Sequence, residues 1–212
     1  MAEALRILDY GLHGGHPALD FVNTLDWRAR PAAEGGPVEL LVSYAALLAW
    51  CRRLGIIGAS TLSELERAAA GNTTQAAAVL TEAIALREAL YRLAQVRRQG
   101  KAAKSGDLKI LNRILLRYPE GRVLAAVNGA QLGWKLHGEG LELGTPLGAI
   151  ARLGADLLVT AAPNSIRCCA GPDCGWLFHD TSPNKQRRWC SMESCGNRAK
   201  ARRHYQRVRK QG

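Results

Sequence analysis

The sequence predicts an α+β protein in which a mostly helical N-terminal domain with a small antiparallel sheet is followed by a cysteine-rich module. Apolar residues recur at three- and four-residue spacing over most of residues 40–116, which is typical of amphipathic helices. β-prone segments separated by Asn-Gly and Gly-Glu-Gly follow at residues 122–143, which indicates a hairpin or a small meander. Five of the six cysteines then lie within residues 167–198.

Four helices are predicted before the hairpin. They span about residues 40–54, 60–70, 74–98 and 108–116. Thr61 and Glu64 fit the pattern of a capping box at the predicted start of the second helix, and the fourth helix is expected to stop before Pro119 because the residue before a proline disfavours helical backbone. A fifth helix, with Pro146 in its first turn, covers residues 145–162. Residues 18–28 are compatible with either helix or strand.

Pro163 and Asn164 mark the predicted boundary between a domain of residues 1–163 and a module of residues 164–212. The two parts differ strongly in charge. The chain carries a net charge of +11, and residues 164–212 contribute most of it, with 11 Lys and Arg residues against three Asp and Glu. This asymmetry predicts a polyanionic partner for the module.

The composition is that of an ordinary globular chain, with 47% hydrophobic and 22% charged residues. Glu3 and Asp9 lie where a signal peptide would have cations and then an apolar run. No segment approaches the roughly 18 consecutive apolar residues of a membrane span. We therefore expect a cytoplasmic protein without membrane contact, in which clustered cysteines are metal ligands rather than disulfides.

The cysteines of the module form two pairs of equal spacing. Four residues separate Cys169 from Cys174 and Cys190 from Cys195, and fifteen residues lie between the pairs. Two short loops that each present two thiolates suit the tetrahedral coordination of zinc, provided that the segment between them folds back as a hairpin. We expect one structural Zn²⁺ bound by these four side chains, with no open position for catalysis.

Other interpretations of the cysteines are open at this point. Four cysteines also bind iron–sulfur clusters, a set of buried inert thiols is a further alternative, and His179 or His204 could replace one ligand. Cys168 competes with Cys169 as the first ligand. If both lie on a strand, their side chains point to opposite faces and only one of them reaches the metal.

A basic helix is predicted after the last cysteine. Residues 196–210 contain good helix formers, Ala201, Tyr205 and Val208 form a narrow apolar stripe, and no acidic residue follows Glu193. Arginine suits phosphates and guanine edges, and a helix fixed by zinc commonly enters a major groove, although a merely solubilising tail is the alternative. The cations expected to contact nucleic acid are Lys185, Arg187, Arg188, Arg198, Lys200, Arg202, Arg203 and Arg207.

The segment with both cysteine pairs, Arg-Arg-Trp-Cys at 187–190 and Cys-Gly-Asn-Arg at 195–198 closely resembles the bacterial CGNR zinc finger. Upstream, "ALDFVNTLDWR" (18–28) and "LLAWCRRLGII" (47–57) resemble the ABATE domain that accompanies this finger. The resemblance implies an α+β regulatory domain followed by a treble-clef-like finger, in a family of proposed stress-related transcription regulators. It also implies that the zinc ligands are Cys169, Cys174, Cys190 and Cys195.

These observations lead us to expect a zinc-dependent, DNA-binding transcription regulator. The finger would contact DNA, while the N-terminal domain senses a small ligand, forms a homodimer, or both. Asp20, Asn23, Thr24 and Arg28 are the most polar group of the "ALDFVNTLDWR" segment, and Asn23 and Arg28 among them are the predicted effector contacts. Helix caps and a buried hydrogen-bond network would explain these two residues equally well.

Two other functions are alternatives. In an RNA-binding factor, Trp176 or Trp189 would stack on a base instead of forming the small core of the module with Phe178. In an enzyme, the zinc module would be an appendage. The first 163 residues contain no phosphate loop, no nucleophile elbow and no His/Glu metal pattern, so we expect no enzymatic activity and no catalytic residues.

Overall fold

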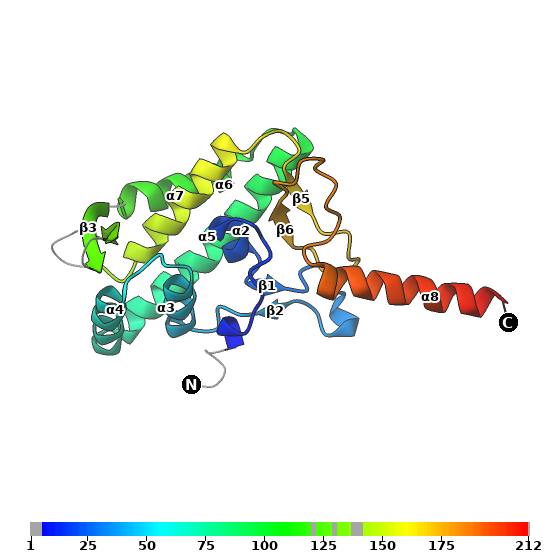
Figure 1. Cartoon of the computed structure of the whole chain (residues 1–212). Coiled ribbons are helices and arrows are strands. Elements are labelled where there is room, and N and C mark those ends of the chain that lie inside the picture. The colour runs from blue at the N-terminus through cyan, green and yellow to red at the C-terminus, as the bar shows by residue number, and fades with distance from the viewer. Residues whose placement is uncertain (1–5, 120–121, 129–130, 137–141, 212) are drawn as a thin grey trace.

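Helix α5 runs through the centre of the helical body in the computed structural model (Figure 1). The structure describes residues 6–119, 122–128, 131–136 and 142–211. Its α-helices are α2 (Pro17–Val22), α3 (Tyr44–Arg53), α4 (Ala59–Gly71), α5 (Thr73–Gln99), α6 (Ser105–Arg117), α7 (Thr145–Thr160) and α8 (Asn197–Gln211). Short helical turns lie at η1 (Arg6–Leu8), η2 (Ala32–Glu34) and η3 (Met192–Gly196).

The helical body, which comprises the described residues up to 163, is built by packing α2, α3, α6 and α7 around α5. Its core is apolar and continuous, and the rings of Phe21 and Trp50 meet inside it with centroids 5.2 Å apart. Helix α3 begins at Tyr44, later than the apolar period predicts, because the Ser43 side chain caps it by accepting a hydrogen bond from the Ala46 N–H. In contrast, α6 begins at Ser105, earlier than predicted.

Three two-stranded antiparallel sheets occur in the described residues, and with the helices they confirm the predicted α+β class. The strands are β1 (Leu25–Asp26) with β2 (Val38–Glu39), β3 (Arg122–Asn128) with β4 (Gln131–Leu136), and β5 (Ile166–Cys168) with β6 (Leu177–His179). The pair β3–β4 is the hairpin expected from the Asn-Gly dipeptide, whose glycine lies outside the described residues, as does the Gly-Glu-Gly segment. Residues 18–28 hold both α2 and β1, which explains their ambiguous pattern.

The cysteine module (residues 164–211) docks on the helical body through β5 and β6, while α8 projects away from it (Figure 1). Asn23, which is 4% exposed at the end of α2, contributes both ends of its amide to this contact. Its Nδ2 donates to the Leu177 carbonyl (2.9 Å) and its Oδ1 accepts from the Leu177 N–H (3.0 Å). The Asn23 side chain thereby makes the two hydrogen bonds to Leu177 that the backbone of a neighbouring strand would make.

The segment before α2 forms a second contact with β6. The His179 N–H donates to the Gly14 carbonyl at 2.7 Å. Gly15 has a φ of +67°, and a Cβ at this position would lie 2.9 Å from the His179 carbonyl oxygen, so glycine is required there. The Asp20 carboxylate holds the turn by accepting from the Gly14 N–H at 2.7 Å.

A third contact links the module to α5 through Arg28. The Arg28 backbone N–H donates to the Cys174 carbonyl (3.1 Å). The Arg28 guanidinium forms a bidentate ion pair with Glu88 and lies 4.1 Å from the Tyr91 ring centroid. Glu88 also pairs with the buried Arg87. The module is therefore bound to the body by specific polar contacts. Among the described residues, no helix is both long and apolar enough to cross a membrane.

We predict that Asn23→Ala destabilises the folded chain by about 2–4 kcal/mol, because the Leu177 N–H and carbonyl lose their partners inside the protein. Chemical denaturation followed by circular dichroism measures this change. Asn72→Ala is the matched control, because it removes only an exposed helix cap and should cost about 1 kcal/mol. Equal losses in the two variants would contradict the docking role of Asn23.

A second prediction concerns pH. Burial raises the pKa of Asp20 from 3.8 to about 6, although the Gly14 N–H and the cations of Arg53 and Arg187 act against it. The ionised carboxylate is therefore penalised in the folded state, and this penalty appears as the pH rises from 3.8 to about 6. Asn keeps the acceptor for Gly14 without the charge. At pH 8, Asp20→Asn should be more stable than the natural chain by about 1–2 kcal/mol.

The control for this prediction is the difference between the two chains at low pH. At about pH 3, below the pKa of Asp20 in both the folded and the unfolded chain, both side chains are neutral, so the stability difference should disappear there. Denaturation curves of both proteins at the two pH values test it. A variant that is less stable than the natural chain at pH 8 would show that the carboxylate charge stabilises the fold.

Candidate metal centre and basic surface

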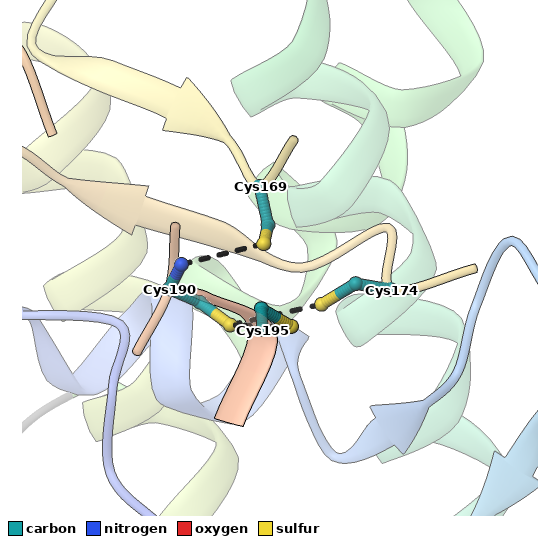
Figure 2. Close-up of side chains that lie close together, drawn as sticks. All are labelled: Cys169, Cys174, Cys190 and Cys195. Atoms are coloured by element: carbon teal, nitrogen blue, oxygen red, sulfur yellow. Dashed lines mark hydrogen bonds between the residues drawn. The ribbon is translucent and has the colours of Figure 1, made fainter. Parts of the chain in front are cut away.

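Four cysteine side chains from separate parts of the module converge on one point (Figure 2). Cys169 follows β5, Cys174 precedes β6, Cys190 ends the long segment after β6, and Cys195 lies in η3 at the root of α8. All four side chains are buried, and their sulfur atoms lie within 4.8 Å of one another. The Sγ of Cys190 is 3.7 Å from that of Cys174 and 3.6 Å from that of Cys195.

These distances fit a tetrahedral zinc site. Four sulfurs at about 2.3 Å from one Zn²⁺ lie about 3.8 Å from each other, close to the spacing of this cluster. The donor set is all thiol, which suits zinc, and a site with four protein ligands has no open position. The cluster thus fits one structural zinc ion.

The turn between the first pair shows why the chain brings the sulfurs together. A Cβ on Gly171 would lie 3.2 Å from the Cβ of Cys174 and 3.3 Å from the Sγ of Cys195, so a larger residue would crowd the cluster. Gly175 has a φ of +67°, which allows the chain to turn sharply into β6. The N–H groups of Gly171 and Cys190 lie 3.4 and 3.3 Å from the Cys169 sulfur, and they stabilise its charged form.

The Cys-Gly-Asn-Arg segment has a structural role at each position. Cys195 belongs to the cluster, and a Cβ on Gly196 would lie 2.8 Å from the Met192 sulfur. The Asn197 side chain donates to the Glu193 carbonyl at 3.1 Å and so joins η3 to α8. Arg198 donates to the Cys195 sulfur at 3.0 Å.

Arg198 also connects the cluster to the helical body. Its guanidinium carbon lies 4.3 Å from the centroid of the Trp27 ring, and that of Arg30 lies 3.9 Å from the same centroid. Hydrogen bonds from neighbouring thiols lower the pKa of Cys195, and Arg198 lowers it further. Hydrogen bonds from Cys174 and Cys190 similarly bring the pKa of Cys169 to about 7. Lowered pKa values favour the thiolate form that a metal binds in Cys195 and Cys169, whereas hydrogen bonds with the neighbouring thiols raise the pKa of Cys174 and Cys190.

The competing ligands lie outside the cluster. Cys168 is part of β5 and packs on the core of the helical body, on the opposite side from Cys169, and burial raises the pKa of its thiol. His179 donates its N–H to Gly14, and His204 is exposed on α8. Among the described residues, no histidine belongs to the group of possible metal ligands that the four cysteines form.

Half of the cations predicted to contact nucleic acid line one cleft. This cleft has a volume of about 700 Å³ and lies between α8, the Gly171–Cys174 turn and Trp189. The predicted cations that line it are Arg188, Arg198, Arg202 and Arg203, and Arg209 joins them. The structure does not bring Lys185, Arg187, Lys200 and Arg207 into this cleft.

Arg187 points into the protein. Its guanidinium donates to the carbonyls of His13 (3.0 Å), Trp189 (3.0 Å) and Cys190, and lies 4.4 Å from the Phe178 ring centroid. These contacts join the segment before Cys190 to the helical body. Its role in nucleic-acid binding stays a prediction, as does that of Lys185, whose carbonyl accepts a hydrogen bond from Arg167.

Sequence reasoning missed Asp180, which is completely buried. Its carboxylate accepts hydrogen bonds from the N–H and hydroxyl of Ser182 and from the N–H of Arg187. Burial alone would raise the pKa of Asp180, but these hydrogen bonds lower it overall. The local signal was Asp-Thr-Ser-Pro, a pattern that favours side-chain-to-backbone turns.

The predicted effector contacts are both occupied by protein groups. Asn23 bonds Leu177, and Arg28 bonds Glu88 and the Val22 carbonyl. Both side chains therefore belong to a buried hydrogen-bond network, which was the alternative explanation that the sequence allowed. Contact with an effector stays a prediction for both residues.

Two family models match the chain, one over the helical body and one over the cysteine module. A family model described as "CGNR zinc finger" matches residues 165–208. A model named ABATE, described as "Putative stress-induced transcription regulator", matches residues 15–161, which is more than half of the chain. The chain therefore belongs to the ABATE family and carries a CGNR zinc finger. Neither description names an enzymatic activity, and no curated protein matches the chain.

We predict that the purified chain contains one zinc ion and that Cys190→Ser lowers its zinc affinity by more than roughly 100-fold. Substituting a group that only hydrogen-bonds to a metal ligand can already lower affinity by up to about 100-fold, so loss of a ligand should lower it further. Elemental analysis and competition with a chelator measure the content and the affinity. Cys168→Ser is the matched control and should keep the zinc. Loss of zinc in Cys168→Ser, or its retention in Cys190→Ser, would contradict the proposed ligand set.

Proposed function

We propose that this protein is a DNA-binding transcription regulator, with residues 164–212 as the DNA-binding finger and residues 1–163 as a domain that senses a small ligand, dimerises, or both. Zinc, bound by Cys169, Cys174, Cys190 and Cys195, holds the root of α8 against the rest of the finger. The observation that carries the proposal is the cleft in which cations of two separate segments face each other. The family descriptions support the regulatory class.

The charge of α8 favours a polyanion. No acidic residue follows Glu193 in the chain, and the described side chains of α8 are almost all exposed. Asp173, 3.8 Å from Arg202, is the one acid in the cleft wall. Crowding cations on an exposed helix without acids costs free energy, and phosphates would remove that cost.

The two faces of α8 differ, which makes the proposal specific. Arg198, Arg202, Tyr205 and Arg209 follow each other at spacings of four, three and four residues, so they share the face that lines the cleft. Lys200 and Arg207 lie on other faces. Arg188 approaches the same cleft from the segment before Cys190. A nucleic-acid backbone in the cleft would therefore be contacted from two sides.

The indole rings argue for a duplex rather than for base stacking. Trp176, at 6% exposed, has no accessible face for a base. Trp189 is half-buried, with the Arg188 guanidinium 5.5 Å from its ring centroid. Tyr205 is 74% exposed and shares the cleft wall with Trp27 and Trp189, whose rings are contacted by the guanidinium groups of Arg198 and Arg188.

We predict that replacing both Arg202 and Arg209 with alanine weakens duplex DNA binding by at least roughly tenfold, because each charge-assisted contact contributes about 1.5–3 kcal/mol. The slope of log K against log salt should fall by about 2, since two phosphate contacts are lost. Fluorescence anisotropy of a labelled duplex over a salt series measures both quantities.

The matched control is the double variant Lys200→Ala with Arg207→Ala, which removes the same charge from other faces. It should change affinity by less than about threefold at physiological salt, where exposed charges are screened beyond about 8 Å. Equal losses in the two variants would contradict the cleft assignment. Preference for single-stranded or duplex RNA over duplex DNA would overturn the proposed function.

A further inference from the structure

A second cavity, of about 240 Å³, lies where the cysteine module meets the helical body. One wall comes from the segment before α2, with Asp9, Tyr10 and His13. Another comes from β1, with Asp26, and the module contributes Trp176, Ser194 and Arg198 together with the cluster cysteines Cys174, Cys190 and Cys195. The cavity is therefore built by segments that are far apart in the sequence, and it lies beside the four-sulfur cluster.

Among the described residues, one buried polar group of this cavity lacks a hydrogen-bond partner, and a second, a carboxylate, lacks an ion-pair partner. The indole N–H of Trp176 has no hydrogen-bond partner among the described residues, although the side chain is 94% buried. Asp26 is 8% exposed, and the backbone N–H of Trp27 donates to its carboxylate, but no cation lies within 4.0 Å of that carboxylate in the described part of the chain. Such groups are costly to bury, and a ligand that satisfies both would recover that cost.

Trp176 and Asp26 require different hydrogen-bonding groups in a ligand. Trp176 offers a donor and so requires an acceptor, which Arg198 on the same wall would assist if the acceptor were anionic. Asp26 requires a donor or a cation, and Asp9 adds a second carboxylate. Burial raises the pKa of Asp26, and the hydrogen bond from the Trp27 N–H and the cations of Arg30 and Arg198 offset this only in part. A ligand ammonium group would favour the ionised form of Asp26.

The size of the cavity limits the ligand further. About 240 Å³ is below the roughly 300–1,000 Å³ of sites for drug-sized molecules. The apolar part of the wall is aromatic, since the Tyr10 ring lies 5.6 Å from that of Trp176. Aromatic faces attract cations as well as apolar groups.

We propose that this cavity is the effector site and that it binds a small zwitterion of amino-acid size, with its ammonium group toward Asp26 and its carboxylate toward Trp176 and Arg198. This proposal rests on the sensing role given to the protein above, and it names the site and the ligand class. The site differs from the Asn23 and Arg28 pair that the sequence suggested. Ser194, Cys195 and Arg198 lie at the root of α8, so an occupied cavity would act directly on the DNA-binding helix.

The test uses the zinc-loaded full-length protein without DNA. Isothermal titration with each of the twenty common L-amino acids should reveal at least one that binds with one site per chain. For that amino acid, the amine that lacks the carboxylate and the acid that lacks the amine should each bind at least tenfold more weakly. Binding of the amine or of the acid alone at full affinity would overturn the zwitterion assignment.

Variants locate the site. Asp26→Asn and Trp176→Phe should each weaken binding at least tenfold, whereas Asp156→Asn, which alters an exposed side chain of α7, should leave it unchanged. Zinc content and circular dichroism show that each variant is folded. If Asp26→Asn fails to fold, Trp176→Phe decides the question, because it removes an N–H that has no partner in the protein.

The two proposals can fail separately. If no amino acid binds while duplex DNA does, the cavity assignment is wrong and the DNA-binding function stands. If an amino acid binds with the expected loss in both variants but duplex DNA does not bind, the cavity stands and the proposed function is wrong. Full affinity in both Asp26→Asn and Trp176→Phe would place the ligand elsewhere and refute the site.

Discussion

Convergence of four sulfurs on one point is the constraint on which the rest of the module depends. Apart from the cysteines, its separate core has only Trp176 and Phe178 as fully buried apolar side chains, too few to hold 48 residues together. The sulfurs fix the turn before β6, the end of the long segment and the start of α8 at the same time. A metal at this point would contribute binding free energy directly to folding.

The cysteine module is not a separate domain joined to the helical body only by a linker, because polar groups of the body form hydrogen bonds that complete the module's structure. Asn23 supplies the hydrogen bonds that β6 would otherwise receive from another strand, and the Arg28 N–H holds the carbonyl of Cys174. Directional contacts of this kind specify one docking geometry, which apolar contacts alone would not. The metal centre and the helical body are consequently parts of one folding unit, joined through Trp27 and Arg198.

Much of this architecture could be predicted from local patterns. Helical periods identified α3 to α7, and the Asn-Gly dipeptide identified β3–β4, because both reflect neighbours close in sequence. The cysteine spacing identified the cluster for the same reason. The direction of Arg187 could not be predicted, because its acceptors are carbonyls of His13, Trp189 and Cys190, which only the folded chain brings together. Asn23 was ambiguous because its partner lies 154 residues away.

In the described part of the chain, helix α8 is held near its start, where η3, Arg198 and Trp27 meet and Arg202 lies 3.8 Å from Asp173. With 15 residues, it extends about 22 Å from this attachment. A rigid rod of that length works as a lever, so a tilt of about 10° at the root displaces its far end by about 4 Å. The distance between Arg202 and Arg209 stays fixed during such a tilt, while the distance from either of them to Arg188 changes. The width of the cleft therefore depends on the angle between α8 and the helical body.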